Sequence, residues 1–267
     1  MKTLFQNLLK ISISLGFLAT GAMDNSVKAA ECANPLTDAA FQALGGDGCS
    51  ITPDMMKITF YEAGFCTANP ISGSTWDTSS CVKAFENSAG HEIDLGTQTF
   101  HSMNGTTYKI PSGTYQYGYV IANNQWDYKG KYTIGGTTYY TATGTSSDMH
   151  STAGNYGIWS DDISFMNGSV DAAANKCWDY VENSSFGLVK SLLMSDSLVV
   201  ASDQTACNNA TKMGGSQKLL KPLTITDKTT TYKVKWIVNG MGMKIIYDGG
   251  GADDFSGGPF TAEFIVK

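Results

Sequence analysis

Apolar and aromatic residues alternate with polar ones along most of this chain, and Gly, Pro, Asn and Asp separate the alternating runs. Alternation with a period of two is typical of strands that bury one face. Short strands between frequent turns predict a mostly β protein, an antiparallel β-sandwich of transthyretin-like or immunoglobulin-like style. The predicted strands cover residues 57–65, 82–85, 92–95, 106–110, 114–122, 130–134, 137–143, 164–170, 222–226, 231–238, 241–247 and 260–266.

Turn signals join several of these strands. Pro111-Ser112-Gly113 predicts a tight turn, and Asp227-Lys228 predicts another. Gly135-Gly136 predicts a two-residue hairpin between residues 130–134 and 137–143. Asn239-Gly240 has the same character and predicts a hairpin between residues 231–238 and 241–247.

One or two short helices accompany the strands. Asn34 is a suitable N-cap, Pro35 suits the first helical position, and Gly45-Gly46 ends the good helix formers of residues 37–44. A second helix is expected from a cap at Asp171 toward Val181.

The N-terminal segment has the features of a signal peptide. Lys2 and Lys10 are followed by an apolar run at residues 11–23, and small residues precede a cut after Ala29. We therefore expect residues 1–29 to be removed and residues 30–267 to form a single β-sandwich domain, with a possible internal boundary near 144–162. Since no later run reaches the ~20 apolar residues of a membrane helix, no transmembrane segment is expected.

The cysteines support export. All six follow residue 31, and an even number is typical of disulfides made in an oxidising compartment. A bridge between Cys66 and Cys81 would close a loop of about 15 residues, and in the chain-entropy model this closure stabilises the fold by about 3 kcal/mol. Fifteen pairings are formally open; the sequence favours Cys66 with Cys81, Cys32 with Cys49 and, by default, Cys177 with Cys207. The extracellular space, the cell surface and the periplasm are all compatible with this pattern.

Charge argues against nucleic-acid binding. The formal net charge is −6, and every one of the 18 basic residues is Lys. Without Arg the chain lacks the bidentate fork that grips phosphate and guanine, so no nucleic-acid partner is expected.

The segment IPSGTYQYGYVI, which begins at Ile110, supports the fold prediction. Together with the strand at Ile58 it resembles transthyretin-like and Cna-B-like modules of bacterial surface proteins over about 60 residues. In such modules a Pro-x-Gly-x-Tyr turn leads into a central strand. The resemblance implies no functional residue here, because the Lys–Asn isopeptide pairing of many Cna-B modules needs an Asn in the last strand and residues 260–267 have none.

Candidate chemistry is sparse. Ser80-Cys81-Val82-Lys83 matches Ser-x-x-Lys, but no Ser-Asp-Asn or Lys-Thr-Gly follows. The three histidines (His91, His101 and His150) lack metal-ligand spacing. Asp253-Asp254, after the glycines at 249–251, has the ligand type of a hard-cation site, whereas Asp161-Asp162 points two carboxylates apart. We expect no enzyme activity, cofactor or metal.

Aromatic residues are the remaining signal. Trp76 and Trp126 occur among Asn, Asp, Gln, Ser and Thr, where a core tryptophan is less expected, whereas Trp236 alternates with valines and is expected in the core. Tyr115, Tyr117 and Tyr119 share one face by their spacing. Trp76, Trp126 and these tyrosines are therefore candidate ligand or partner contacts.

Function is expected to be structural or adhesive. The sequence favours a non-enzymatic secreted protein of a bacterial cell surface or extracellular structure. The terminal strand from Phe260 to Val266 would pair within its own sheet or with another copy by strand addition. The alternatives are a secreted glycan- or small-ligand-binding module and a hydrolase with no recognisable motif.

Overall fold

The computed structural model describes residues 31–100, 103–163, 177–183, 187–229, 232–249, 253–258 and 260–266. The predicted signal peptide, the predicted strand at 164–170, the start of the second predicted helix and His101 lie outside these ranges. The helices and strands are α1 (Asp38–Leu44), β1 (Cys49–Ile51), β2 (Met55–Cys66), β3 (Ile71–Ser72), β4 (Thr75–Trp76), β5 (Cys81–Asp94), β6 (Thr106–Thr107), β7 (Gly113–Asn123), β8 (Gln125–Lys129), β9 (Lys131–Ile134), β10 (Thr137–Tyr140), β11 (Trp159–Asp162), β12 (Trp178–Asn183), β13 (Gly187–Met194), α2 (Gln204–Asn208), β14 (Lys212–Ile225), β15 (Tyr232–Ile237), β16 (Met243–Ile246), β17 (Asp254–Gly257) and β18 (Thr261–Val266).

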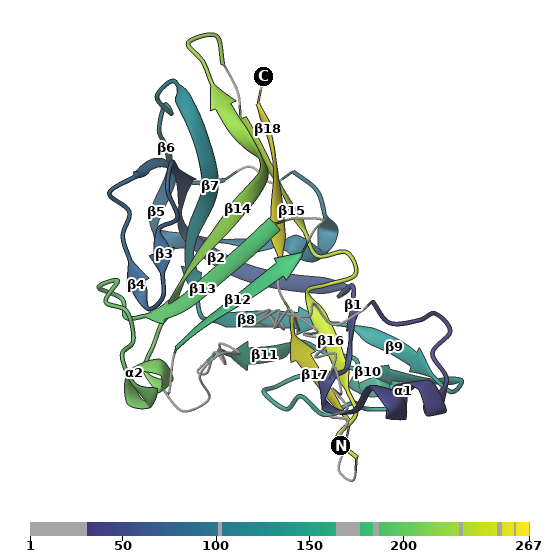
Figure 1. Cartoon of the computed structure of the whole chain (residues 1–267). Coiled ribbons are helices and arrows are strands. Elements are labelled where there is room, and N and C mark those ends of the chain that lie inside the picture. Colours follow the sequence, from purple (N-terminus) through teal and green to yellow (C-terminus); the bar gives the residue numbers. More distant parts are fainter. Residues whose placement is uncertain are drawn as a thin grey trace, which may run out of the picture.

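One large antiparallel sheet organises the protein (Figure 1). β2 pairs with β5 along one edge and with both β7 and β8 along the other. β7 and β8 are almost continuous, and their far edge pairs with β14 beside β7 and with β11 beside β8. β13 and β12 extend the sheet beyond β14.

Asn124, between β7 and β8, is where the outer neighbour of this long strand changes from β14 to β11. Its N–H donates to the carbonyl of Thr211 at 3.3 Å, and its carbonyl accepts from the N–H of Ile163 at 2.9 Å. Its side-chain Nδ2 donates to the carbonyls of Ala210, at 2.8 Å, and Ile163, at 3.3 Å. A single asparagine thus satisfies backbone groups of two strand ends that pairing alone leaves free.

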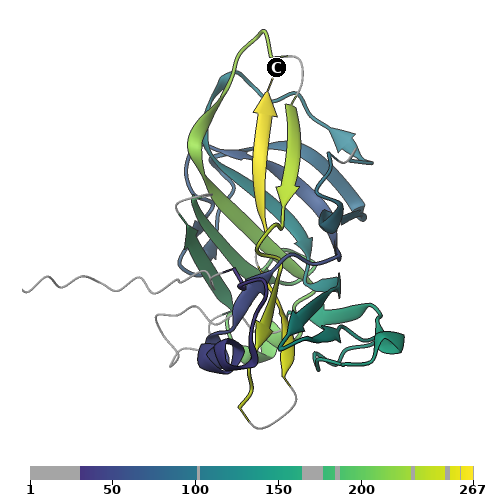
Figure 2. The same cartoon turned by 90° about the vertical axis from the view of Figure 1, so that its right-hand side faces the viewer.

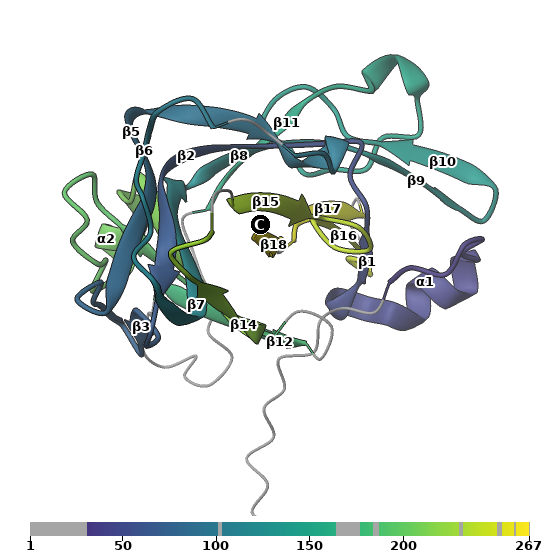
Figure 3. The same ribbon diagram turned by 90° about the horizontal axis from the view of Figure 1, so that it is seen from above.

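A second layer, the antiparallel pair of β15 and β18, lies inside the curve of the large sheet (Figure 3). Trp236 of β15 stacks on Phe60 of β2 with ring centroids 4.7 Å apart. Phe264 of β18 meets Phe65 edge-on at 5.0 Å, in the space left by Gly118, where a Cβ would lie 2.8 Å from the Phe264 ring. The arrangement is sandwich-like, with aromatic rings filling the concave face.

β18 is also held to the sheet by a side chain. Gln217 of β14 accepts a hydrogen bond from the N–H of Ala262 at 2.9 Å and donates one to its carbonyl at 3.3 Å. The amide of Gln217 thus makes the two bonds that a neighbouring strand would otherwise make.

Smaller units cover the lower end of the molecule (Figure 2). β1, β16 and β17 form a three-stranded sheet, β9 and β10 form a hairpin, and α1 packs Phe41 edge-on against Tyr247. No helix among the described ranges combines the length and the apolar character that crossing a bilayer demands.

All three expected disulfides are present, which confirms the predicted pairing. Cys32 bonds to Cys49, Cys66 to Cys81 and Cys177 to Cys207. The mostly β, antiparallel fold class is also confirmed. The Gly135-Gly136 hairpin between β9 and β10 forms as predicted, with positive φ at both glycines.

Several element predictions were wrong. The first helix begins at Asp38 with Thr37 as its N-cap, because the preceding residues are held extended by bridges such as Leu36 with Ile134. The Asn239-Gly240 turn exists, but it joins strands of different sheets, since β15 pairs with β18 and β16 with β1 and β17. The two strands predicted at 82–85 and 92–95 are one, because β2 pairs with both ends of β5, across an irregularity between them.

Other predicted elements are shorter, longer or of a different type in the structure, and some observed elements were not predicted. The predicted strand at 106–110 is only the two residues of β6. Residues 178–181, the end of the second predicted helix, belong instead to strand β12, whose backbone pairs with β13. The predicted turn before the last strand contains β17, and the predicted strand at 222–226 is the end of the longer β14. β8, β11, β13 and α2 were not predicted.

A half-buried carboxylate, that of Asp161, lies beside aromatic rings where β8, β11 and β17 meet. Asp161 sits directly opposite Trp126, beside Tyr128, whose ring stacks on Trp159 at 5.1 Å. Burial, and to a lesser degree the charge of Asp162, raises the pKa of Asp161. Among the described residues, the buried hydroxyl of Tyr128 has no hydrogen-bond partner. The charged form of Asp161 therefore costs folding free energy.

We predict that Asn124→Ala destabilises the protein by about 1–3 kcal/mol, because two carbonyls lose their donor. Urea denaturation measures the loss. Gln116→Ala, an exposed amide on the same strand, is the control and should change stability by about 0.5 kcal/mol or less. Equal effects of the two substitutions would contradict the role given to Asn124.

We predict that Asp161→Asn stabilises the protein at neutral pH. The folded-state pKa is raised, so the folded protein binds the proton more tightly and stability falls as pH rises through that pKa. The gain from Asn should therefore shrink at pH values below the ordinary Asp pKa, where Asp161 is neutral. Denaturation at several pH values measures this, with Asp148→Asn, an exposed aspartate that does not contribute to the raised pKa of Asp161, as control. A pH-independent gain would contradict the prediction.

Candidate functional site

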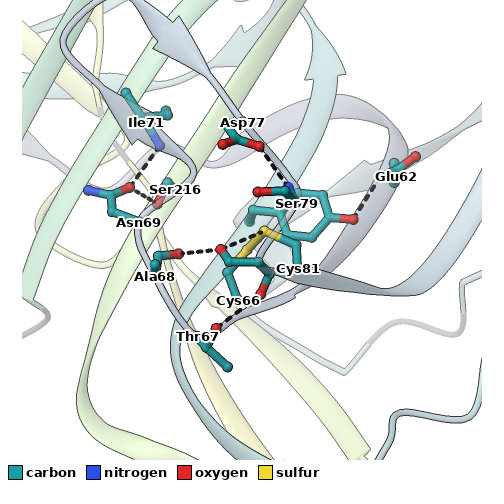
Figure 4. The surroundings of a disulfide bond; sticks show 12 residues. Glu62, Cys66, Thr67, Ala68, Asn69, Ile71, Asp77, Ser79, Cys81 and Ser216 are labelled. Carbon is teal, nitrogen blue, oxygen red and sulfur yellow. Dashed lines mark hydrogen bonds between the residues drawn. A yellow bond between two sulfur atoms is a disulfide. The ribbon is translucent and has the colours of Figure 1, made fainter.

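The loop closed by the Cys66–Cys81 disulfide folds over the convex face of the large sheet, and we call residues 66–81 the flap (Figure 4). Its two ends are joined by hydrogen bonds from the N–H of Thr67 to the carbonyl of Ser80 at 3.0 Å and from Ser80 Oγ to the carbonyl of Ala68 at 3.3 Å. Between them, β3 and β4 form a two-residue hairpin. The flap is thus a small ordered unit and not an open loop.

Asn69 and Ile71 fix the flap to the sheet. Asn69 Oδ1 accepts from Ser216 Oγ of β14 at 2.9 Å and from the N–H of Ile71 at 3.0 Å. Ile71 is buried against Leu192 and Met194 of β13. One polar and one apolar contact therefore hold the flap against two adjacent strands.

Two glycines make room for aromatic rings on this face. A Cβ at Gly64 would lie 2.5 Å from the ring of Tyr119 and 2.2 Å from the carbonyl oxygen of Val82. A Cβ at Gly214 would lie 3.0 Å from the ring of Trp76. The Trp76 and Tyr119 rings meet edge-on with centroids 5.9 Å apart. Interior strand glycines thus allow the two rings to approach the backbone closely.

A pocket of about 290 Å³ lies between the flap, the sheet and the loop that follows β13. This volume is near the lower end of the range for small-molecule sites. We call it the flap pocket. Its lining includes the side chains of Glu62, Lys83, Tyr119, Trp76, Thr78 and Leu198.

A charged network forms one side of the flap pocket. Glu62 of β2 and Glu86 of β5 are directly opposite each other, which by itself is destabilising. Lys83 Nζ lies 2.8 Å from Glu62 Oε2 and 2.8 Å from Glu86 Oε1. The hydroxyl of Tyr119 donates to Glu62 Oε1 at 2.7 Å, and that of Tyr108 donates to Glu86 Oε2 at 2.6 Å. The ammonium offsets the repulsion of the two carboxylates.

The network shifts the pKa values of Lys83, Glu86 and Tyr119 farther from neutral pH. Burial lowers the pKa of Lys83, but the hydrogen bonds that its ammonium donates to both carboxylates outweigh this effect and raise that pKa. The hydrogen bonds from Lys83 and Tyr108 lower the pKa of Glu86. Burial and the bond to Glu62 raise the pKa of Tyr119. Lys83 is thus charged and Tyr119 neutral over the physiological range.

Leu198 gives the pocket an apolar rim. It adopts a positive φ of 60°, which is unusual for a residue with a branched side chain, and it is 37% exposed. The next residue, Val199, is 66% exposed. Leu198 and Val199 thus present apolar surface to solvent in the turn beside the flap pocket.

Of the predicted contact residues, Trp76 and Tyr119 lie in the flap pocket. Trp126 was wrongly assigned to the surface: it is 5% exposed, and its indole N–H donates to the carbonyl of Asn123 at 2.9 Å. Tyr115 does not share the face of Tyr119, because it packs against Phe65 in the interior, next to an irregularity in the β7–β14 pairing. Tyr117 is half-buried outside the pocket lining.

Among the described residues, the other candidates do not come together in a shared site. Ser80 Oγ of the Ser-x-x-Lys match donates to the carbonyl of Ala68 within the flap, while Lys83 is ion-paired with Glu62 and Glu86. Asp254 accepts from Ser147 Oγ at 2.9 Å and Asp253 from the N–H of Asp248 at 3.3 Å. No group of three or more His, Cys, Asp or Glu side chains suited to a metal occurs in the described ranges.

Glu62 had no signal of its own in the sequence, and Lys83 stood out only through the Ser-x-x-Lys match. The two charged residues and Tyr119 come from three different strands. The available signal was Gly64 inside an otherwise strong strand pattern, which is typical of close approach by another group.

No protein-family model, no curated protein and no solved structure matches this chain. The site must therefore be interpreted from its own geometry.

We predict that Lys83→Met lowers the free energy of unfolding by about 1 kcal/mol, a modest value because the pairs are partly solvated. Adding Glu86→Gln should restore most of the loss by removing the repulsion between the carboxylates. Urea denaturation at low salt measures both, with Lys57→Met as control, since its partner Glu92 is well exposed. Failure of the second substitution to restore stability would contradict charge repulsion as the cause.

Proposed function

We propose that this protein is an exported, non-enzymatic binding module that takes a small polar ligand in the flap pocket. The observation that carries the proposal is the combination of an aromatic wall, Trp76 and Tyr119, with the Glu62–Lys83 pair in one cavity. Such a set of convergent polar groups beside aromatic rings is typical of ligand sites. The glycan- or small-ligand-binding alternative is therefore preferred to a purely structural role.

The electrostatics favour binding over catalysis. A general acid or base works best with a pKa near the operating pH. In the flap pocket, the neighbours of Lys83 raise its pKa and burial raises that of Tyr119. Next to the pocket, Lys83 and Tyr108 lower the pKa of Glu86. These groups hold fixed charge states, which suits a site that orients a ligand. The hydrolase alternative gains no support from them.

Export is supported by the signal peptide predicted at residues 1–29 and by the three disulfides. One of these disulfides closes the flap, so an oxidising environment is where the pocket would be complete. We place the protein at the cell surface or in the extracellular space, with the periplasm as the alternative.

Assembly by strand addition is less favoured. β18 pairs with β15 of its own chain over six residues, and Gln217 occupies both backbone groups of Ala262 on the other side. Self-assembly through Phe260 to Val266 would have to displace these contacts. A structural or adhesive subunit therefore stays the second proposal.

We predict that a screen of small polar molecules will find ligands that raise the melting temperature of the oxidised protein, because a ligand that binds only the folded state stabilises it. Trp76→Ala should abolish the shift, whereas Phe100→Ala, an exposed aromatic outside the pocket lining, should retain it. The readout is thermal unfolding. No shift across a broad library, or shifts that Trp76→Ala leaves intact, would overturn the proposal.

A further inference from the structure

The hydrogen-bonding positions that the flap pocket leaves open define the ligand it can take. Glu62 uses one position on each carboxylate oxygen, for Tyr119 and Lys83, and a carboxylate offers about four in all. Lys83 uses two of the three N–H donors that an ammonium carries. Within the part of the chain that the structure describes, acceptor positions on Glu62 and one donor on Lys83 thus stay open. The atoms that carry them, Lys83 Nζ and Glu62 Oε2, are ion-paired and lie 2.8 Å apart, so the open positions are neighbours.

Such a pair suits neighbouring hydroxyl groups. A hydroxyl both donates and accepts, so one hydroxyl can donate to Glu62 while the next accepts from Lys83. Tyr119 adds an acceptor, because its own proton is committed to Glu62. Thr78, at the flap side of the pocket, adds a further hydroxyl.

The charge of the cluster argues against a strongly charged ligand. Glu62 and Glu86 contribute two negative charges and Lys83 one positive charge, which leaves −1. An anionic ligand would have to approach Lys83 beside both carboxylates, and like charges at that distance repel. A cation would compete with the ammonium that is already between the carboxylates. A neutral ligand meets neither cost.

The remaining walls are aromatic and apolar. Trp76 contributes an indole that is only partly buried, and Leu198 adds the strained apolar rim. Ring C–H groups of a sugar provide the apolar surface that packs against such walls, while its hydroxyls point outward from the ring edge. One sugar ring can therefore contact both the polar side of the pocket and its aromatic and apolar side.

We infer that the ligand of the flap pocket is a neutral saccharide, bound through two adjacent hydroxyls to the Glu62–Lys83 pair and through its ring to Trp76. This inference rests on the proposed function, since it names the ligand class of that same pocket.

The test is calorimetric titration of the oxidised mature protein, residues 30–267, with neutral and charged probes. Neutral probes are the methyl glycosides of glucose, galactose and mannose, with N-acetylglucosamine; charged probes are glucuronate, glucosamine and free amino acids. At least one neutral sugar should bind more tightly than every charged probe. Because the ligand is uncharged, its affinity should change little between about 50 and 500 mM salt, whereas the affinity of an ionic ligand would fall.

Variants separate the contacts. Glu62→Gln should weaken sugar binding by about tenfold, because the bond to a charged acceptor is replaced by one to a neutral amide. Trp76→Ala should weaken it at least as much, and Phe100→Ala should leave it unchanged. Circular dichroism and the melting temperature confirm that each variant is folded.

The outcomes distinguish the two proposals. Binding of amino acids or charged sugars in preference to neutral ones, with dependence on Trp76, would overturn the saccharide inference and leave the pocket as a ligand site. Sugar binding that is unaffected by Glu62→Gln and Trp76→Ala would also overturn it. Absence of any ligand in both the thermal screen and the titrations would overturn both proposals.

Discussion

The continuity of the β7–β8 strand across Asn124 is the constraint on which the rest of the structure depends. A strand can have one partner at a time on each edge, and here the far edge must serve β14 and then β11. The side-chain amide of Asn124 bonds to carbonyls at both strand ends, so the change of partner leaves these backbone groups satisfied. β14 also carries Gly214, which makes room for Trp76 of the flap, and Gln217, which holds β18. The positions of the flap and of the β15–β18 layer therefore both depend on this junction.

The register of β2 and β7 places a glycine beside an aromatic ring on each face of the sheet. Gly64 pairs with Tyr119 on the convex face, and the next pair, Phe65 with Gly118, faces the concave side. The convex pair makes room for the flap pocket, and the concave pair makes room for Phe264 of the terminal strand. A shift of one residue would put each ring on the wrong face, so a single register determines both the core and the site.

The sequence predicted those features of the fold that depend on residues close together along the chain. The Cys66–Cys81 loop, the Gly135-Gly136 hairpin and the long alternating strand at Tyr119 are of this kind. The turn at Asn239-Gly240 was predicted correctly, but β15 pairs with β18, nearly thirty residues farther along the chain, and no local pattern specifies that partner. Likewise Glu62, Lys83 and Tyr119 meet only through strand pairing, and Trp126 has polar sequence neighbours although its ring points inward.

The flap has one covalent and several non-covalent attachments, and because of them it loses its conformational freedom during folding and not during ligand binding. In most binding loops, ordering opposes each association event and weakens affinity. Here the Cys66–Cys81 bond removes much of that freedom once, during oxidative folding, and Asn69 and Ile71 hold the closed loop against the sheet. The wall that carries Trp76 is therefore pre-organised by the redox chemistry of the compartment in which the chain matures.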